Sequence, residues 1–220
     1  MATTYRGGVM TPGPVFDPLI EALSARPTRR IADEERTPRG ERAAAVLMLF
    51  TDTPDPALTF VTRAETLRRH AGQIALPGGR VDPGDLGRAD TALREANEEI
   101  GLLRSGVAIF GELPPLWVPA SGYDVTTVLA AWDGHQRLHP VDPAETGAVH
   151  QYPVSQLASN EVRVTGRHPS GFRGPAFALG DQFIWGLTAL LVDWVLELAG
   201  WRQPWDEDRI VDVPKRFMRD

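Results

Sequence analysis

The 220-residue chain has no cysteine, and Lys215 is its only lysine. Without cysteine the chain has no catalytic thiol, no thiolate zinc site and no disulfide, and this composition suits a reducing cytoplasm. A P-loop needs a lysine directly after its glycines, and none is placed for one. These absences argue against thiol enzymes and P-loop nucleotide-binding proteins.

A long apolar run and a surplus of positive charge are also missing. The start, MATTYRGGVM, has no apolar core of signal-peptide length. The apolar stretch FIWGLTALLVDWVLELAG is interrupted by Asp193 and Glu197, which fall with Gly186 and Ala189 on one helical face, so we expect an amphipathic core helix and no membrane span. The net charge of −6 argues against nucleic-acid binding. We therefore expect a cytoplasmic protein with no nucleic-acid or membrane partner; a homodimer is allowed but not required.

The length fits one domain with extensions. We divide the chain into an N-terminal extension with a short helix (1–40), a main domain (41–200) and a C-terminal tail (201–220). The patterns predict helices at 16–25, 88–100 and near 182–199, and strands at 43–51, 57–64, 107–113, 125–133 and 148–154. Strands and helices do not alternate regularly, which favours an α+β fold around a mixed sheet over a Rossmann fold.

The helix expected at 88–100 carries three carboxylates, Glu95, Glu98 and Glu99. At about 100° per residue, they lie beside an apolar stripe that includes Ala92 and Ala96. Like charges four residues apart, as at Glu95 and Glu99, repel each other on an isolated helix. Helical geometry alone fits a solvated face and a site for a hard divalent cation equally well.

Upstream of this helix stands the turn-rich stretch LPGGRVDPGDLG. Gly78 and Gly79 permit a close backbone approach that a side chain would block. A glycine turn about 15 residues before a carboxylate helix favours the metal site over the solvated face.

These residues resemble the Nudix hydrolase family, whose box reads G-x5-E-x7-R-E-U-x-E-E-x-G-U, with U an apolar residue. REANEEIGL (94–102) matches the second half in full, and Gly79 takes the first glycine. Asp85 stands at the first acidic position in place of glutamate, and eight residues instead of seven separate it from Arg94.

The extra residue resembles the coenzyme A pyrophosphatase branch of this family. That branch carries L-T-x-R-S-x-x-L-R-x-H-x-G-Q-x-x-F-P-G-G, and this chain has VTRAETLRRHAGQIALPGG at 61–79. Ala64 replaces the serine and Leu76 the phenylalanine. LPPLWVPASGY (113–123) and IWGLTA (184–189) are also similar to the branch, so the resemblance covers roughly residues 42–199.

The resemblance implies a Nudix fold, an α/β/α sandwich around a mixed β-sheet, and cleavage of a nucleoside diphosphate linked to another moiety. It implies that Glu95, Glu98 and Glu99 bind Mg²⁺ or Mn²⁺, with the carbonyl of Gly79 as a further ligand, and that Arg94 holds the glutamates by ion pairs. The general base is either Glu145, on the loop VDPAETGAV, or Glu95 itself. The substrate-binding candidates are Arg63, Arg68, Arg69, His70 and Gln73.

The substrate expected from the branch is coenzyme A or an acyl-CoA, cleaved to 3′,5′-ADP and (acyl-)4′-phosphopantetheine. The arginines before the loop suit a substrate with a 3′-phosphate as well as a diphosphate, because guanidinium groups bind phosphate with two hydrogen bonds. Two alternatives stay open: a Nudix enzyme acting on NADH, ADP-ribose or a nucleotide sugar, and a non-catalytic nucleotide-binding module. Trp117 and Tyr123 are either adenine-stacking or core residues.

Overall fold

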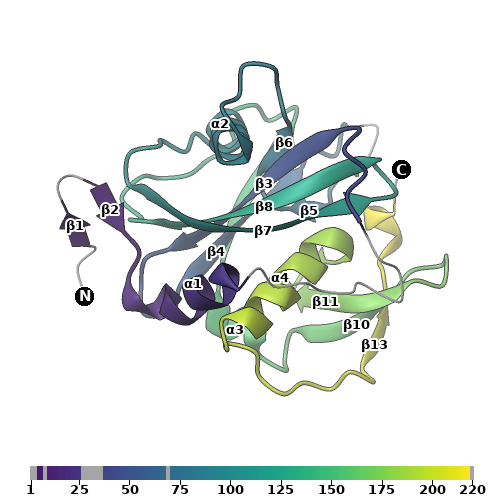
Figure 1. The fold of residues 1–220 in the computed structure, drawn as a ribbon. Coiled ribbons are helices and arrows are strands. Elements are labelled where there is room, and N and C mark those ends of the chain that lie inside the picture. The colour runs from purple at the N-terminus through teal and green to yellow at the C-terminus, as the bar shows by residue number, and fades with distance from the viewer. Residues whose placement is uncertain (1–3, 7–8, 26–36, 68–69, 219–220) are drawn as a thin grey trace.

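A computed structural model describes residues 4–6, 9–25, 37–67 and 70–218 (Figure 1). At its centre lies a mixed sheet of seven strands: β3 (Ala43–Thr51), β4 (Ala57–Arg63), β5 (Ile74–Ala75), β6 (Gly78–Arg80), β7 (Val107–Val118), β8 (Tyr123–Trp132) and β9 (Thr146–Pro153). Its main path is β5-β4-β3-β8-β7, with β6 paired to β3 and β9 to β4. β3 and β8 run parallel from Ala43 and Asp124 to Thr51 and Trp132, while the other pairings described in this sheet are antiparallel.

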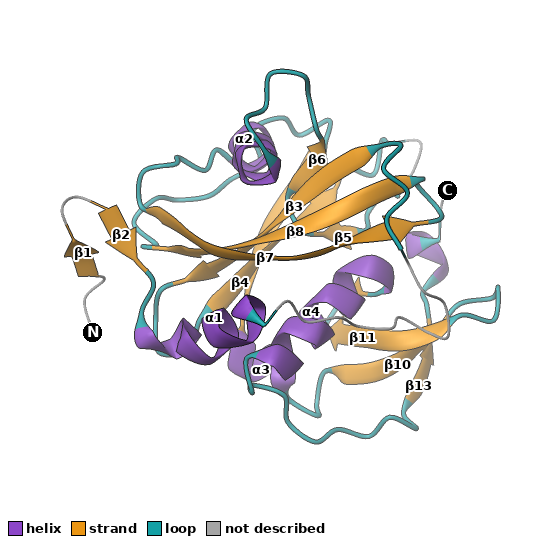
Figure 2. Cartoon of the chain, viewed as in Figure 1, coloured by secondary structure: helices purple, strands orange, loops and turns teal. Residues whose placement is uncertain are grey.

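Both faces of this sheet are covered, as the side chains of β3 show. Leu47 and Leu49 pack on the face covered by α2 (Arg88–Ile100), whereas Met48 and Phe50 pack on the opposite face. The alternation follows from the two-residue period of a strand. α1 (Asp17–Ser24), α3 (Val154–Ala158) and α4 (Gly186–Leu198) lie on the face away from α2 (Figure 2). The predicted α/β/α sandwich is confirmed.

A second sheet lies beyond α4 and was not predicted. Its strands β10 (Arg163–Arg167), β11 (Arg173–Leu179), β12 (Gln182–Ile184) and β13 (Ile210–Asp212) lie in the order β12-β11-β10-β13. β13 pairs in parallel with β10, so the chain after α4 returns to complete this sheet. Short strands with little apolar alternation leave a weak sequence pattern.

Both flanks of the main domain pack against it where the structure describes them. The N-terminal flank holds β1 (Thr4–Arg6), β2 (Val9–Thr11) and a 3₁₀ turn η1 (Pro14–Phe16), and Phe16 and Leu19 are fully buried in the main core. The C-terminal flank ends in a second 3₁₀ turn, η2 (Lys215–Phe217), with Phe217 buried under the second sheet. The division into three segments stays a prediction.

The expected elements are present with small differences in length. The strand at 43–51 and the helix at 88–100 have the predicted bounds. β7 continues past residue 113 to Val118, with a register shift between Leu113 and Leu116. Two prolines stand there, and a proline has no N–H for the sheet ladder.

α4 forms where a helix was expected, but the amphipathic interpretation is wrong at Asp193. Its side chain is 3% exposed and pairs with the buried Arg163 of β10, because the second sheet covers that face. Only a tertiary neighbour could show this. Within the described residues, no helix is both long and apolar enough to cross a membrane.

Candidate active site

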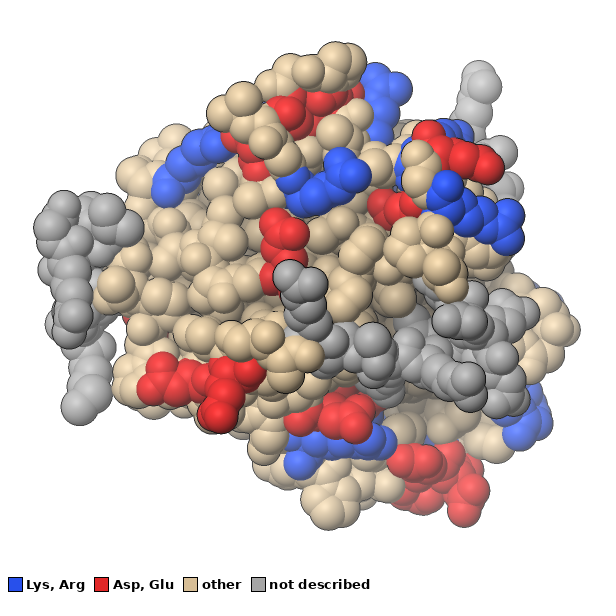
Figure 3. All heavy atoms as spheres, viewed as in Figure 1, with Lys and Arg blue, Asp and Glu red and all other residues tan. Residues whose placement is uncertain are grey.

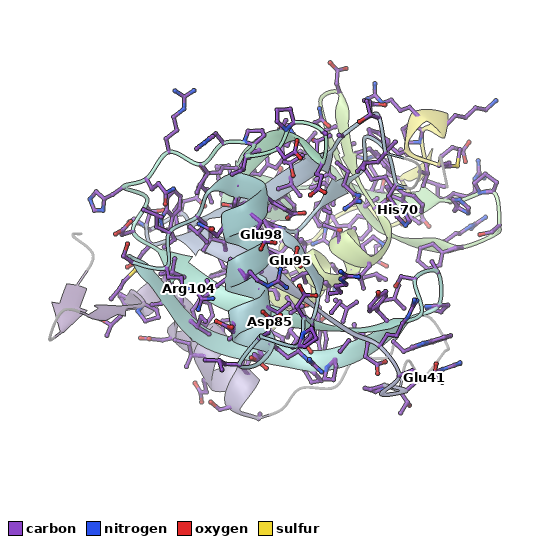
Figure 4. The ribbon with its side chains drawn as sticks, turned by 90° about the horizontal axis from the view of Figure 1, so that it is seen from above. Glu41, His70, Asp85, Glu95, Glu98 and Arg104 are labelled. Atoms are coloured by element: carbon purple, nitrogen blue, oxygen red, sulfur yellow. The ribbon has the colours of Figure 1, made fainter. Side chains whose placement is uncertain are left out.

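α2 presents its apolar stripe to the sheet and its carboxylates to one edge. Ala92, Ala96 and Ile100 are fully buried against β3 and β8, as the helical period predicts. Gly101 ends the helix with a left-handed backbone (φ 70°), which glycine adopts without a Cβ clash. Figure 4, seen from above, shows Glu95 and Glu98 on α2 with Asp85 beside them.

Arg94 connects the acidic groups of this edge. Its Nη1 donates to Glu95 Oε1 at 3.0 Å and to Glu98 Oε2 at 3.0 Å, and its Nη2 donates to the carbonyl of Arg80 at 3.0 Å. A single nitrogen of Arg94 therefore bridges two of the three carboxylates, Glu95 and Glu98.

Asp85 anchors Arg94 from the loop. Its two carboxylate oxygens accept hydrogen bonds from Arg94 Nε at 2.9 Å and Nη2 at 3.1 Å, and its side chain is 3% exposed. The Arg94 hydrogen bonds, with those from the Asp82 N–H and the Thr91 hydroxyl, hold the pKa of Asp85 well below its usual range. The shorter aspartate at this position therefore orients the arginine.

The glycine loop comes into direct contact with the carboxylates. The Gly78 N–H donates to Glu99 Oε2 at 3.0 Å, and β6 pairs with β3 through Gly78 and Gly79. A Cβ on Gly79 would lie 2.4 Å from the carboxyl carbon of Glu95, and one on Gly78 would lie 2.4 Å from the Ala45 carbonyl. Neither glycine can take a side chain without displacing an atom of the site.

Burial makes negative charge costly at this edge. It raises the pKa of Glu99 to about 7, against the opposing effect of the Gly78 hydrogen bond, and it also raises the pKa of Glu95. The charges of Glu95 and Glu145 act on Glu99 in the same direction, whereas that of Arg63 opposes them. A cation placed among these groups would relieve the excess of negative charge.

The donor set fits Mg²⁺ or Mn²⁺, which prefer carboxylate and carbonyl oxygens. Among the described residues, no group of three His, Cys, Asp or Glu side chains is placed so that it could hold a metal ion as it stands. One oxygen each of Glu95, Glu98 and Glu99 instead accepts a hydrogen bond from Arg94 or from the Gly78 N–H. Glu98 has room to turn, because its side chain is 57% exposed.

Glu145 lies on the loop before β9 and is exposed. Its backbone carbonyl accepts a hydrogen bond from the Ala64 N–H at 2.9 Å, which fixes this loop beside the end of β4. Its charge acts on Glu99. The structure thus brings the proposed base, 46 residues further along the chain, to the same site as Glu99.

The substrate-binding candidates that lie within the described residues share one cavity. Arg63, His70 and Gln73 line one cavity of about 490 Å³, and Figure 4 shows His70 apart from the labelled carboxylates. Gln73 is held between His70 Nδ1, at 3.2 Å from its Oε1, and the Phe217 carbonyl, at 2.7 Å from its Nε2. Arg68 and Arg69 lie outside the described residues.

Trp117 and Tyr123, considered for adenine stacking, are each covered by an arginine. The Arg39 guanidinium lies 3.5 Å from the Trp117 ring centroid and that of Arg42 lies 4.2 Å from Tyr123. The aromatic side chains that line the cavity together with Arg63 are instead Phe172 and Trp185, of which the sequence indicated only Trp185, through the similarity of IWGLTA. In Figure 3 acidic side chains gather at the top of the molecule, around α2, with basic ones beside them.

Comparison with known proteins decides the family. The sequence model of the NUDIX domain matches residues 41–170, more than half of the chain. The chain belongs to the Nudix family. A Nudix hydrolase is an enzyme, and members of the family generally use divalent metal ions.

Curated relatives carry the same family name. "Uncharacterized Nudix hydrolase NudL" of Yersinia pestis (strain Pestoides F) is 36% identical over 154 residues, covering 69% of this chain and 76% of the relative. The protein of that name from Yersinia pseudotuberculosis (serotype O:1b, strain IP 31758) matches equally well.

Solved structures are more distant. The Nudix hydrolase RenU of M. smegmatis is 24% identical, with a TM-score of 0.45 and coverage of 53% of this chain and 73% of that one. The NUDIX domain of Shewanella oneidensis NrtR, complexed with ADP ribose, is 19% identical, with a TM-score of 0.42 and coverage of 56% and 80%. The predictions of a Nudix fold and a Nudix hydrolase are confirmed, while the substrate, the metal and the roles of single residues stay predictions.

Proposed function

We propose that this Nudix hydrolase is a Mg²⁺- or Mn²⁺-dependent pyrophosphatase. It cleaves coenzyme A or acyl-CoA to 3′,5′-ADP and (acyl-)4′-phosphopantetheine. The observation that carries the proposal is the packing of Glu95 and Glu99 against the Gly78–Gly79 loop, with Glu98 joined to Glu95 through Arg94 and with Arg63, whose charge acts on Glu99, lining the cavity. The residues of the resembling motif, Arg63, His70 and Gln73, line that cavity. A cytoplasmic location accords with this substrate.

Each group of the site has a part in this reaction. Glu95, Glu98 and Glu99, with the Gly79 carbonyl, would hold the divalent ions, and the ions would supply charge neutralisation of phosphate oxygens and a lowered pKa for an attacking water. Arg94 fixes the glutamates and is itself fixed by Asp85. Arg63 binds the diphosphate at the mouth of the cavity, and Glu145 accepts the proton of the attacking water, with Glu95 as the alternative base.

A substrate panel tests the proposal. Coenzyme A, acyl-CoA, 3′-dephospho-CoA, NADH, ADP-ribose and a nucleotide sugar are incubated with the protein, with and without Mn²⁺, and the products are separated by chromatography. We expect metal-dependent release of 3′,5′-ADP from coenzyme A and acyl-CoA. Equal cleavage of 3′-dephospho-CoA would rule out recognition of the 3′-phosphate, and preference for NADH or ADP-ribose would identify the alternative Nudix activity. The same preparation gives the oligomeric state by light scattering.

The carboxylates provide the second test. We expect Glu98→Gln and Glu99→Gln each to lower kcat by about 10²-fold or more, because removing one charge from a preorganised site weakens transition-state stabilisation. The control is Glu161→Gln, an exposed glutamate on the second-sheet side of the molecule. The Mn²⁺-induced rise of the thermal midpoint should also shrink in both site variants. Unchanged turnover in both would refute the metal assignment, and absence of turnover in the wild type would favour a nucleotide-binding module.

A further inference from the structure

The cavity beyond Arg63 is enclosed by two parts of the chain that lie far apart in the sequence. One wall comes from the central sheet and includes Arg63, Gln73 and Ile74. The other comes from the β10–β11 hairpin and the start of α4 and includes Phe172, Trp185 and Thr188. The family model ends at residue 170, so most of the second wall lies outside the matched region.

The charge distribution in this cavity is one-sided. Among its described lining residues, Arg63 is the only one with a permanent charge, and none is acidic. The charge of Arg63 acts on Glu99, and the N–H of the next residue, Ala64, donates to the Glu145 carbonyl at 2.9 Å, so the charged end of the cavity lies toward the loop that carries Glu145. Arg63 Nε is buried and makes no hydrogen bond within the described structure, while the side chain as a whole lines the cavity.

Away from Arg63 the described lining of the cavity carries no permanent charge and is amphipathic. Leu187 and Leu190 of α4 line it together with Trp185, whose ring stacks on His168 with centroids 5.4 Å apart and an angle of 9° between the rings. His168 Nδ1 accepts a hydrogen bond from the Ser170 N–H at 3.2 Å and lies 2.8 Å from the Ser170 hydroxyl oxygen, and these contacts orient the ring. Such a wall accepts apolar groups and neutral amides, but burying a charge here without a partner would be costly.

The two halves of coenzyme A, the nucleotide and the amide-containing arm, differ in charge. The nucleotide half carries a further phosphate on its ribose, which needs a cation of its own, whereas the other half is an uncharged flexible chain with amide groups. We propose that this cavity binds the uncharged amide-containing arm of the substrate, with Trp185 forming its far wall and Arg63 holding the diphosphate at its entrance. This inference rests on the proposed function and assigns the β10–β11 hairpin and the start of α4 a role in specificity.

Two variants test the assignment by binding alone, without turnover. Trp185→Ala removes the aromatic wall, and Ala120→Trp, at an exposed turn on the rim, fills the mouth without disturbing the core. The probes are the two proposed products, 4′-phosphopantetheine and 3′,5′-ADP, titrated by calorimetry. We expect both variants to weaken binding of 4′-phosphopantetheine about ten-fold or more and to leave that of 3′,5′-ADP within about two-fold. Trp117→Ala, outside the cavity, is the matched control.

Different outcomes of these experiments would contradict the cavity assignment and the proposed reaction. Loss of 3′,5′-ADP binding with intact 4′-phosphopantetheine binding would place the nucleotide in the cavity and overturn the inference while leaving pyrophosphatase activity intact. Binding of 4′-phosphopantetheine that neither variant weakens would overturn it as well. Wild-type protein that binds 4′-phosphopantetheine through Trp185 but hydrolyses no coenzyme A would support the cavity assignment and refute the proposed reaction. In steady-state assays we expect a higher KM for coenzyme A in both variants with kcat little changed.

Discussion

At the scale of single residues, the site depends on two glycines and one arginine. Gly79 lets the Glu95 carboxyl group approach the loop backbone, and Arg94 distributes its donors over Asp85, Glu95 and Glu98. None of these contacts adds much hydrophobic burial. Their effect is to fix the positions of the carboxylates before any substrate arrives, which is how a preorganised polar site contributes to rate.

Gly79→Ala tests this dependence. Its Cβ would lie 2.4 Å from the carboxyl carbon of Glu95, so the carboxylate must move. We expect kcat to fall about 10²-fold, since a displacement of about 1 Å can have that effect. Gly84→Ala, in the same loop with no atom within 4 Å of the new Cβ, should keep wild-type kcat. Full activity of Gly79→Ala would show that the close packing of Glu95 on the loop is not needed.

The general base of the proposed reaction is either Glu145 or Glu95. Glu145 is exposed, yet its charge acts on the buried Glu99. We expect Glu145→Gln to lower kcat by about 10²-fold or more without changing Mn²⁺ binding, as for loss of a base that does not ligate the metal. Wild-type turnover in this variant, together with a large loss in Glu95→Gln, would assign the base to Glu95.

At the scale of elements, α4 and β10 are joined by a buried ion pair. The Arg163 side chain is 1% exposed and that of Asp193 is 3% exposed, and the Arg163 guanidinium lies 4.6 Å from the Trp205 ring centroid. Arg163 Nε and Nη1 are buried without hydrogen-bond partners in the described structure. The pair therefore orients α4 against the second sheet at the cost of desolvating two charges.

Asp193→Leu should lower the free energy of unfolding by about 3–5 kcal/mol, because it leaves Arg163 buried without its counter-charge. Adding Arg163→Met to the same chain should restore most of the loss, since no charge then remains in the interior. Glu197→Gln, an exposed neighbour on α4, should change stability by less than about 1 kcal/mol. Urea denaturation measures all three. A double variant no more stable than the single one would contradict this explanation.

At the scale of the whole molecule, an aromatic cluster joins both flanks to the central sheet. Trp201, after α4, has its ring centroid 6.1 Å from that of Phe16 in the N-terminal flank and 5.8 Å from that of Phe50 on β3. Aromatic pairs at such distances contribute beyond the area that they bury. We therefore expect the described flanks to unfold with the Nudix domain in one transition.

Trp201→Ala should reduce the free energy of unfolding by about 3 kcal/mol, at the low end for a tryptophan truncation because the ring is only partly buried. Leu86→Ala, a 94% exposed side chain, should change it by less than about 0.5 kcal/mol. Thermal unfolding followed by near-UV and far-UV circular dichroism should show coincident transitions in both variants. A separate early transition in the wild type would show that the flanks are independent of the domain.

Much of the catalytic side of the molecule could be predicted from the sequence. α2 and β3 have their predicted bounds because α2 carries an apolar helical period and β3 a continuous apolar run, and local patterns of that length determine local structure. The box residues are close in sequence, so their shared helix already brings Glu95, Glu98 and Glu99 to one edge. The second sheet could not be predicted in this way, because its strands are short and obtain their partners from distant segments.

The sequence by itself determined the family, the carboxylate helix and the glycine loop before it, because these depend on residue spacing within a few turns of chain. Only the tertiary structure decided that Arg94 is held by Asp85, that the charge of Glu145 acts on Glu99 and that Asp193 is buried. It also decided that Arg63 and Trp185, 122 residues apart, line one cavity. These outcomes depend on how the two sheets pack around α4. The burial of side chains, and the interaction of charges that are distant in the sequence, exist only once that packing has formed.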